Sequence, residues 1–154
     1  MTRTKLIFSL ITVTCVWGVQ AMAADGLITL RSSYEPKDTM NRLESEVKAK
    51  GLTVFARIDH AAGAAQVGLS LPPTELLIFG NAKGGTPLMQ SVQTIGIDLP
   101  LKALVWRDAS GTTWLSYNDP YWIAKRHGLG HEADTPVKAM STALAVMAKA
   151  ATAP

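Results

Sequence analysis

The composition of this 154-residue chain, with 47% hydrophobic and 18% charged residues, is that of one domain with a single hydrophobic core. The formal net charge is +3, and no run of basic residues is interleaved with aromatic ones, which excludes the broad basic surface typical of a nucleic-acid-binding domain. Cys15 is the single cysteine, so an intrachain disulfide is excluded as well.

The N-terminus has the order of a secretory signal peptide. Arg3 and Lys5 come first, an uncharged apolar run over residues 6–19 follows, and the small residues Ala21 and Ala23 precede the expected cut. The alternative is an uncleaved membrane anchor. That alternative is disfavoured because spanning a bilayer takes about 20 apolar residues, and this run is shorter. We therefore expect cleavage after Ala23.

Cleavage would change the location, the net charge and the thiol content of the remaining chain. Residues 1–23 are the predicted signal peptide, and residues 24–154 form a single domain in the periplasm or outside the cell. The leader removes Arg3 and Lys5 from the 15 basic residues, so the formal net charge of the remainder is +1. Cys15 leaves with the leader, and with it any thiol chemistry. We expect neither nucleic acid nor, after cleavage, a membrane as partner.

The first half of the mature chain alternates strands and helices. Residues 27–33 are β-branched and roughly alternating, which predicts a strand. A helix follows from Pro36 to Gly51, with apolar residues at helical spacing, and residues 52–58 form a second strand. Residues 59–68 predict a short alanine-rich helix. Residues 75–80 are almost continuously apolar, which favours a strand covered on both faces.

The second half begins with a loop over residues 81–85, and we expect the next helix to start at Thr86 and Pro87 and to stop at Gly96. Residues 101–107 and 112–117 form a predicted hairpin. A short helix over 120–127 and a final helix over 136–149 complete the chain, with fraying expected over 150–154.

Together these elements predict an α+β fold, a single two-layer domain. Its sheet is mostly antiparallel, has about five strands and is flanked by helices. The expected order is strand, helix, strand, helix, strand, helix, strand, strand, helix, helix, with a core over about residues 26–130.

Five segments in this order resemble the bacterial and archaeal family called domain of unknown function 302: residues 51–62, 77–81, 86–89, 98–102 and 116–120. The resemblance spans about Gly26 to Gly130. It implies an α+β fold with a sheet flanked by helices, and a homodimer, but no activity. One departure is that Ala82 follows Asn81, where the family usually has proline, which relaxes that loop.

Polar residues at the ends of predicted strands are the candidate ligand-binding residues. Asp59 and His60 follow one strand, where a histidine could bind a ligand or transfer a proton. The plainer interpretation is that Asp59 caps the next helix and His60 lies at the surface. Asn81 and Lys83 follow the next strand in a glycine-bearing loop that could approach an anion, or simply form a turn.

Tyr117 and Asp119, close to two further aromatic residues, form the second candidate region. The plainer interpretation is that Asp119 caps a helix and Tyr117 packs in the core. A single cleft containing His60, Asn81 and Tyr117 requires their strand ends to converge.

The signals for a metal are weak. His127 and His131 have i, i+4 spacing, but Gly128 and Gly130 argue against a helix there, and no third ligand is placed. The methionines of the predicted helices are explained as core residues rather than copper ligands. We therefore predict no metal site, and the sequence names no cofactor.

These features favour a small-molecule or partner-binding module. Two alternatives stay open: a small hydrolase or isomerase-like enzyme with His60 as general base, oriented by Asp59 or Asp119, and a structural or interaction protein of the cell envelope. A carboxylate within hydrogen-bonding distance of His60 in a pocket would favour the enzyme. A large apolar surface without any pocket would favour the envelope protein.

Overall fold

A computed structural model describes residues 22–24 and 26–154 of the chain. The predicted leader lies outside the described residues except for Met22 and Ala23. Within the described part, no helix is long and apolar enough to cross a membrane.

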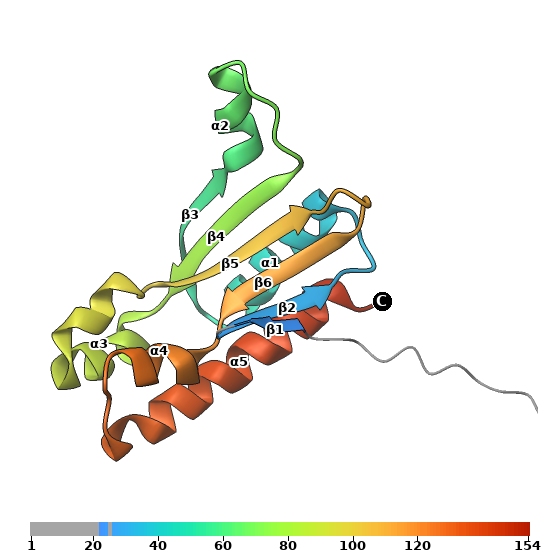
Figure 1. The fold of residues 1–154 in the computed structure, drawn as a ribbon. Coiled ribbons are helices and arrows are strands. Elements are labelled where there is room, and N and C mark those ends of the chain that lie inside the picture. The colour runs from blue at the N-terminus through green and yellow to red at the C-terminus, as the bar shows by residue number, and fades with distance from the viewer. Residues whose placement is uncertain (1–21, 25) are drawn as a thin grey trace, which may run out of the picture.

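The domain is built on one antiparallel sheet. Its strands lie in the order β1-β2-β6-β5-β4-β3, and every neighbouring pair is antiparallel (Figure 1). The bounds are β1 Met22–Ala24, β2 Leu27–Arg31, β3 Thr53–Asp59, β4 Thr74–Gly80, β5 Leu101–Arg107 and β6 Thr113–Asn118. The five longer strands are those predicted, and the three-residue β1 adds a sixth at one edge. The predicted α+β class and element order are confirmed.

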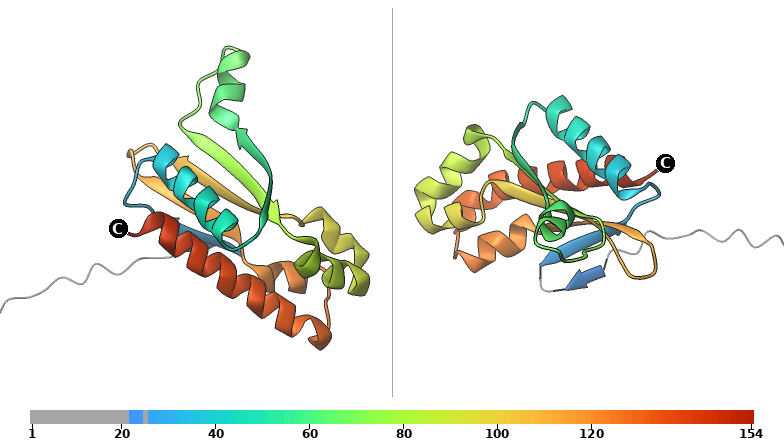
Figure 2. Two further views of the ribbon diagram at one scale, coloured as in Figure 1. Left: turned by 180° about the vertical axis from the view of Figure 1, so that it is seen from behind. Right: turned by 90° about the horizontal axis from the view of Figure 1, so that it is seen from above.

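Two helices, α1 (Pro36–Ala49) and α5 (Asp134–Thr152), cover one face of this sheet (Figure 2). In α1, apolar side chains at helical spacing point to the sheet and charged ones to solvent, and Pro36 at the first turn starts the helix without losing a hydrogen bond. The core between the layers is made of fully buried side chains, among them Met40, Leu43, Val47, Leu77, Phe79, Val105, Leu115, Leu144 and Met147.

No helix covers the other face among the described elements. There the rings of Trp106 and Trp114 stack with centroids 6.2 Å apart, and Trp106 Nε1 donates to Ser116 Oγ at 2.9 Å. Leu76 and Ile78 on β4 are only partly buried on this side, so the expectation that this strand is covered on both faces is wrong. The homodimer expected from the resemblance stays a prediction.

The remaining helices lie at the two ends of the sheet. The helix α2 (His60–Gln66) follows β3 and projects from the top in Figure 1, whereas α3 (Ala82–Ser91) and α4 (Pro120–Arg126) lie at the opposite end. Two short 3-10 helices complete the chain, η1 (Gln93–Ile97) and η2 (His131–Ala133). Antiparallel pairing explains why α2 lies at one end of the sheet and α3 and α4 at the other. The strand β3 ends where β4 begins, whereas β4 and β6 run in the same direction, so the helices that follow β4 and β6 start at the same end.

The bounds of α3 and α5 differ from prediction at both ends: α3 ends at Ser91 rather than at Gly96, and α5 begins at Asp134 rather than at Pro136. The helix α3 starts at Ala82, and Pro87 lies inside it rather than at its first turn, because the Asn81 side chain caps the backbone N–H of Gly84 at 2.7 Å. The helix α5 continues to Thr152, so the predicted fraying is wrong for this stretch. Ala151 is fully buried, and Ser33 N–H donates to Thr152 O at 2.9 Å.

Candidate functional site

A cavity of about 690 Å³ lies between α3, α5 and the adjoining parts of the sheet. Its wall is mostly apolar, and its lining residues come from four regions: Leu52 and Phe55; Gly80 to Gly85 with Met89; Leu99, Pro100 and Leu101; and Pro136, Ala139, Met140, Ala143 and Met147. A volume in this range and an apolar wall with few polar groups are typical of small-molecule sites.

An irregularity in β3 contributes Phe55 to the wall. Val54 pairs with Phe79 and Ala56 pairs with Ile78, so the register shifts and Phe55 is left without a partner on β4. Such a bulge bends the strand and re-aims the extra side chain. Phe55 is 56% exposed although it is a large apolar residue, and it lines the cavity.

Three methionines, Met89, Met140 and Met147, form much of the apolar wall. Met147 is fully buried, whereas Met89 and Met140 are partly exposed. An unbranched thioether side chain adapts to irregular shapes, so such a wall can fit more than one apolar ligand.

The polar part of the lining is the first turn of α3. The Asn81 side-chain oxygen Oδ1 accepts from Gly84 N–H, and the backbone carbonyl oxygen of Asn81 accepts from Gly85 N–H at 3.2 Å. The first amides of a helix have no partner within the helix, so those of Ala82 and Lys83 are left for water or a ligand. Lys83 is the one charged side chain among the lining residues.

The structure places two of the six predicted site residues, Asn81 and Lys83, in this cavity. Asp59 and His60 lie at the opposite end of the sheet. Asp59 Oδ1 accepts from Ala62 N–H at 2.8 Å as the cap of α2. His60 is exposed, and no carboxylate of the described residues lies within hydrogen-bonding distance of it. The geometry expected for a His60 general base is therefore not formed within the described chain.

Tyr117 and Asp119 lie at the same end of the sheet as Asn81 but outside the cavity lining. Tyr117 is buried in the core, and burial together with the negative charge of Asp119 raises the pKa of its phenol. Asp119 Oδ1 accepts from Tyr121 N–H at 3.0 Å and caps α4. The single cleft that would contain His60, Asn81 and Tyr117 is not formed.

A histidine–aspartate pair escaped the sequence analysis. His127 Nε2 lies 2.7 Å from Asp98 Oδ2, and the two side chains are only 8% and 12% exposed. Thr94 Oγ1 lies 3.2 Å from His127 Nδ1, and Arg126 Nη1 lies 3.2 Å from Asp98 Oδ1. The aspartate acceptor places a hydrogen on Nε2, so in the neutral ring Nδ1 accepts from the threonine hydroxyl. This network joins η1 to the end of α4.

His127 and His131 do not face a common metal. His131 is fully exposed, and its Nδ1 lies 3.1 Å from Asp134 Oδ2, in a separate pair. Among the described residues no group of three or more His, Cys, Asp or Glu side chains is placed to hold a metal ion.

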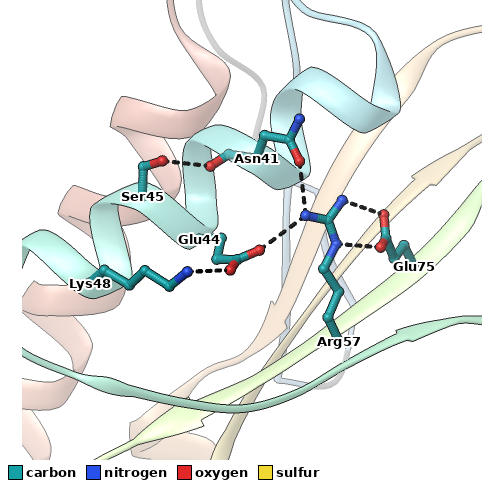
Figure 3. Close-up of polar contacts among 6 residues, drawn as sticks. All are labelled: Asn41, Glu44, Ser45, Lys48, Arg57 and Glu75. Atoms are coloured by element: carbon teal, nitrogen blue, oxygen red, sulfur yellow. Dashed lines mark hydrogen bonds and ion pairs between the residues drawn. The ribbon is translucent and has the colours of Figure 1, made fainter.

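A second polar cluster surrounds Arg57 on the α1 side of the sheet (Figure 3). The guanidinium binds both carboxylate oxygens of Glu75, and its Nη1 lies 3.0 Å from Glu44 Oε2 and 2.8 Å from Asn41 Oδ1. Hydrogen bonds from Lys48 and Arg57 lower the pKa of Glu44. A hollow of about 280 Å³ adjoins this cluster. Because its arginine is already satisfied by two carboxylates, the cluster ties α1 to β3 and β4 rather than offering an anion site.

Residues 28–147 match the family described as Domain of unknown function DUF302. The chain belongs to this family. A solved structure agrees with that assignment: the crystal structure of an uncharacterized conserved DUF302 protein from Bacillus stearothermophilus superposes with a TM-score of 0.74, covering 83% of this chain and 99% of that one. At 20% sequence identity, this likeness shows the shared DUF302 fold alone.

The DUF302 domain also occurs in longer relatives. Proteins named "Fluoride-specific ion channel FluC 1" from Brucella suis and "Fluoride-specific ion channel FluC 2" from Brucella melitensis are 50% identical to this chain over 124 residues, or 80% of it. The match covers 49% and 46% of those proteins. The chain thus spans about half the length of the curated relatives it matches, and their name describes the whole proteins.

Proposed function

We propose that this DUF302 domain is an exported binding module whose cavity takes up a small, largely apolar molecule. The observation that carries the proposal is the 690 Å³ cavity, with a wall of methionine, leucine, alanine and proline side chains and polar groups confined to one turn of helix. That combination is what small-molecule sites usually present.

The lining favours binding over catalysis. Lys83 is the one titratable side chain in it, and the lining contains no histidine, carboxylate, serine or cysteine. Acid–base or nucleophilic catalysis needs such a group within hydrogen-bonding reach of the substrate. The partly buried pair of His127 and Asp98 lies outside the lining, so it does not supply such a group.

Ligand uptake can be tested with the neutral fluorescent probe N-phenylnaphthylamine and a variant that fills the cavity. Ala139 lies on the exposed rim of α5 and lines the cavity, so Ala139→Trp should occlude it without disturbing the core. Ala145 is exposed on the same helix outside the lining, and Ala145→Trp is the matched control.

With the probe at about 100 times its Kd, we expect the melting temperature of the wild type and of Ala145→Trp to rise by roughly 5–10 °C. Ala139→Trp should show no rise. An equal rise in all three proteins, or no rise in any, contradicts the proposal.

Export is supported by the basic start, the apolar run and the small residues before Ala24. Mass spectrometry of the protein from its own host should give a chain beginning at Ala24 in the periplasmic or culture fraction. Removal of Met22 and Ala23 would leave only Ala24 of β1 and make β2 the edge strand. A full-length chain in the cytosolic fraction contradicts export.

A second candidate function rests on the Brucella relatives. Half of each protein named a fluoride-specific ion channel is 50% identical to this domain. We propose as an alternative that the domain acts together with a fluoride channel, outside the membrane that holds the channel. A strain lacking the gene should then grow worse in fluoride and recover when the full chain is restored, whereas unchanged growth contradicts this alternative.

A further inference from the structure

The polarity of the cavity identifies the class of ligand. We propose that it takes a single-chain amphiphile with an anionic head, such as an alkyl carboxylate or alkyl phosphate, whose head lies at Lys83 and whose chain lies against the methionine wall. This inference rests on the proposed function, because it requires that the cavity take up a ligand.

The charge of the cavity lining favours an anionic group on the ligand. Of all its residues only Lys83 is charged, and no acidic side chain faces it within the lining. Lys83 is exposed and forms no ion pair or side-chain hydrogen bond with another described residue. A cation without a counter-charge at the rim of an apolar cavity favours an anionic group on the ligand.

The position of that charge at one end of the cavity favours a ligand with a single charged end. Lys83 lies in the first turn of α3, next to Asn81, and the backbone amides of this turn give the same positive sign to one end of the cavity. The α5 wall, in contrast, contains no polar side chain among its lining members, which are Pro136, Ala139, Met140, Ala143 and Met147. A ligand that satisfies both ends is charged at one end and apolar along the rest.

Calorimetric titration with three ten-carbon probes tests the inference: decanoate, decanol and decyltrimethylammonium, all below their micelle concentrations. Lys83→Gln should weaken decanoate binding about fivefold, the upper end of what a solvent-exposed ion pair contributes, and leave decanol binding unchanged. Lys83→Glu should weaken decanoate further and tighten decyltrimethylammonium. Lys125 is exposed on α4 outside the lining, so Lys125→Gln removes the same charge and should change nothing.

Chain length tests the apolar end. From octanoate to decanoate, each added methylene should tighten binding about fourfold, as expected for burial of a CH₂ group. Decyl phosphate distinguishes the two head groups, and tighter binding of either one agrees with an anionic head.

The outcomes separate the two proposals. If neither decanoate nor decanol binds the wild type, the cavity does not take up such chains, and the proposed function fails along with this inference. If both bind and Lys83→Gln affects them equally or not at all, the proposed function stands and the anionic head is overturned.

Discussion

The indole ring of Trp122 lies directly over the Cα of Gly26, so that a Cβ added at Gly26 would come within 2.1 Å of Trp122 Cγ. Gly26 also has φ +83°, a conformation that other residues rarely adopt. Its carbonyl oxygen accepts from Asp119 N–H at 2.7 Å. The start of β2 is therefore fixed against α4 by a close approach that only glycine permits.

Gly26→Ala should consequently destabilise the domain by about 2–4 kcal/mol, from the strained backbone and the displaced ring together. The free energy of unfolding in urea measures this loss of stability. Gly63 is the control, because it lies in α2 with an ordinary φ and nothing within 4 Å of an added Cβ. Gly63→Ala should leave stability unchanged or raise it by up to about 1 kcal/mol. Equal effects at the two glycines would contradict the contact.

Arg57 should matter to stability more than its surface position suggests. Arg57→Gln leaves Glu44 and Glu75 facing each other without the guanidinium, and we expect a loss of about 1–2 kcal/mol in urea unfolding. The double variant Arg57→Gln with Glu75→Gln should recover part of this loss. Lys48→Gln removes a more exposed partner of Glu44 and should cost less than about 0.5 kcal/mol.

Asp108, in the hairpin turn between β5 and β6, should stay ionised at a lower pH than an ordinary aspartate. Hydrogen bonds from the side chains of Ser110 and Trp114 lower the pKa of Asp108 from 3.8 to about 2. Because the folded pKa is depressed, the stabilisation is present above about pH 4 and is lost as the pH falls toward 2. A carboxyl NMR titration should show a midpoint near 2 for the wild type and a higher one for Ser110→Ala. A wild-type midpoint near 4 would show that these bonds do not form.

Two aspartate–histidine pairs in the chain differ in burial and allow a matched comparison. Asp98 binds His127 at 2.7 Å with both side chains nearly covered, whereas Asp134 and His131 are exposed. Asp98→Asn should destabilise the domain by about 1–3 kcal/mol, since it weakens a hydrogen-bonded pair whose side chains are nearly covered. Asp134→Asn should change stability by less than about 0.5 kcal/mol. Both values come from urea unfolding, and equal values would remove the structural role assigned to Asp98.

Much of the fold could be predicted because local chemistry decides it. Asp59 and Asp119 cap the helices that follow them, as their side chains suggested, and the apolar spacing around Met40 predicted the helix that covers the sheet. The start of α3 could not be predicted from its local sequence. Gly84 and Gly85 suggested a loop, but the Asn81 cap and the packing of Leu88 outweigh the helix cost of two glycines.

The site was predictable only in part, for a different reason. Asn81 and Lys83 were identified from their position after a strand, but grouping them with His60 required the order and direction of the strands, which the sequence does not show. Antiparallel pairing places His60 at the far end of the sheet. The cavity itself depends on the bulge at Phe55 and on how α5 lies beside α3, and both arise from tertiary packing.

The most direct test of ligand uptake is methyl NMR of the mature domain, in which three of the four methionines line the cavity and the fourth serves as a control. Met89, Met140 and Met147 line the cavity, whereas Met40 is buried in the core and is not a lining residue. Titration with decanol should shift the first three methyl signals and leave that of Met40 in place. Unchanged signals at all four would contradict a ligand in this cavity.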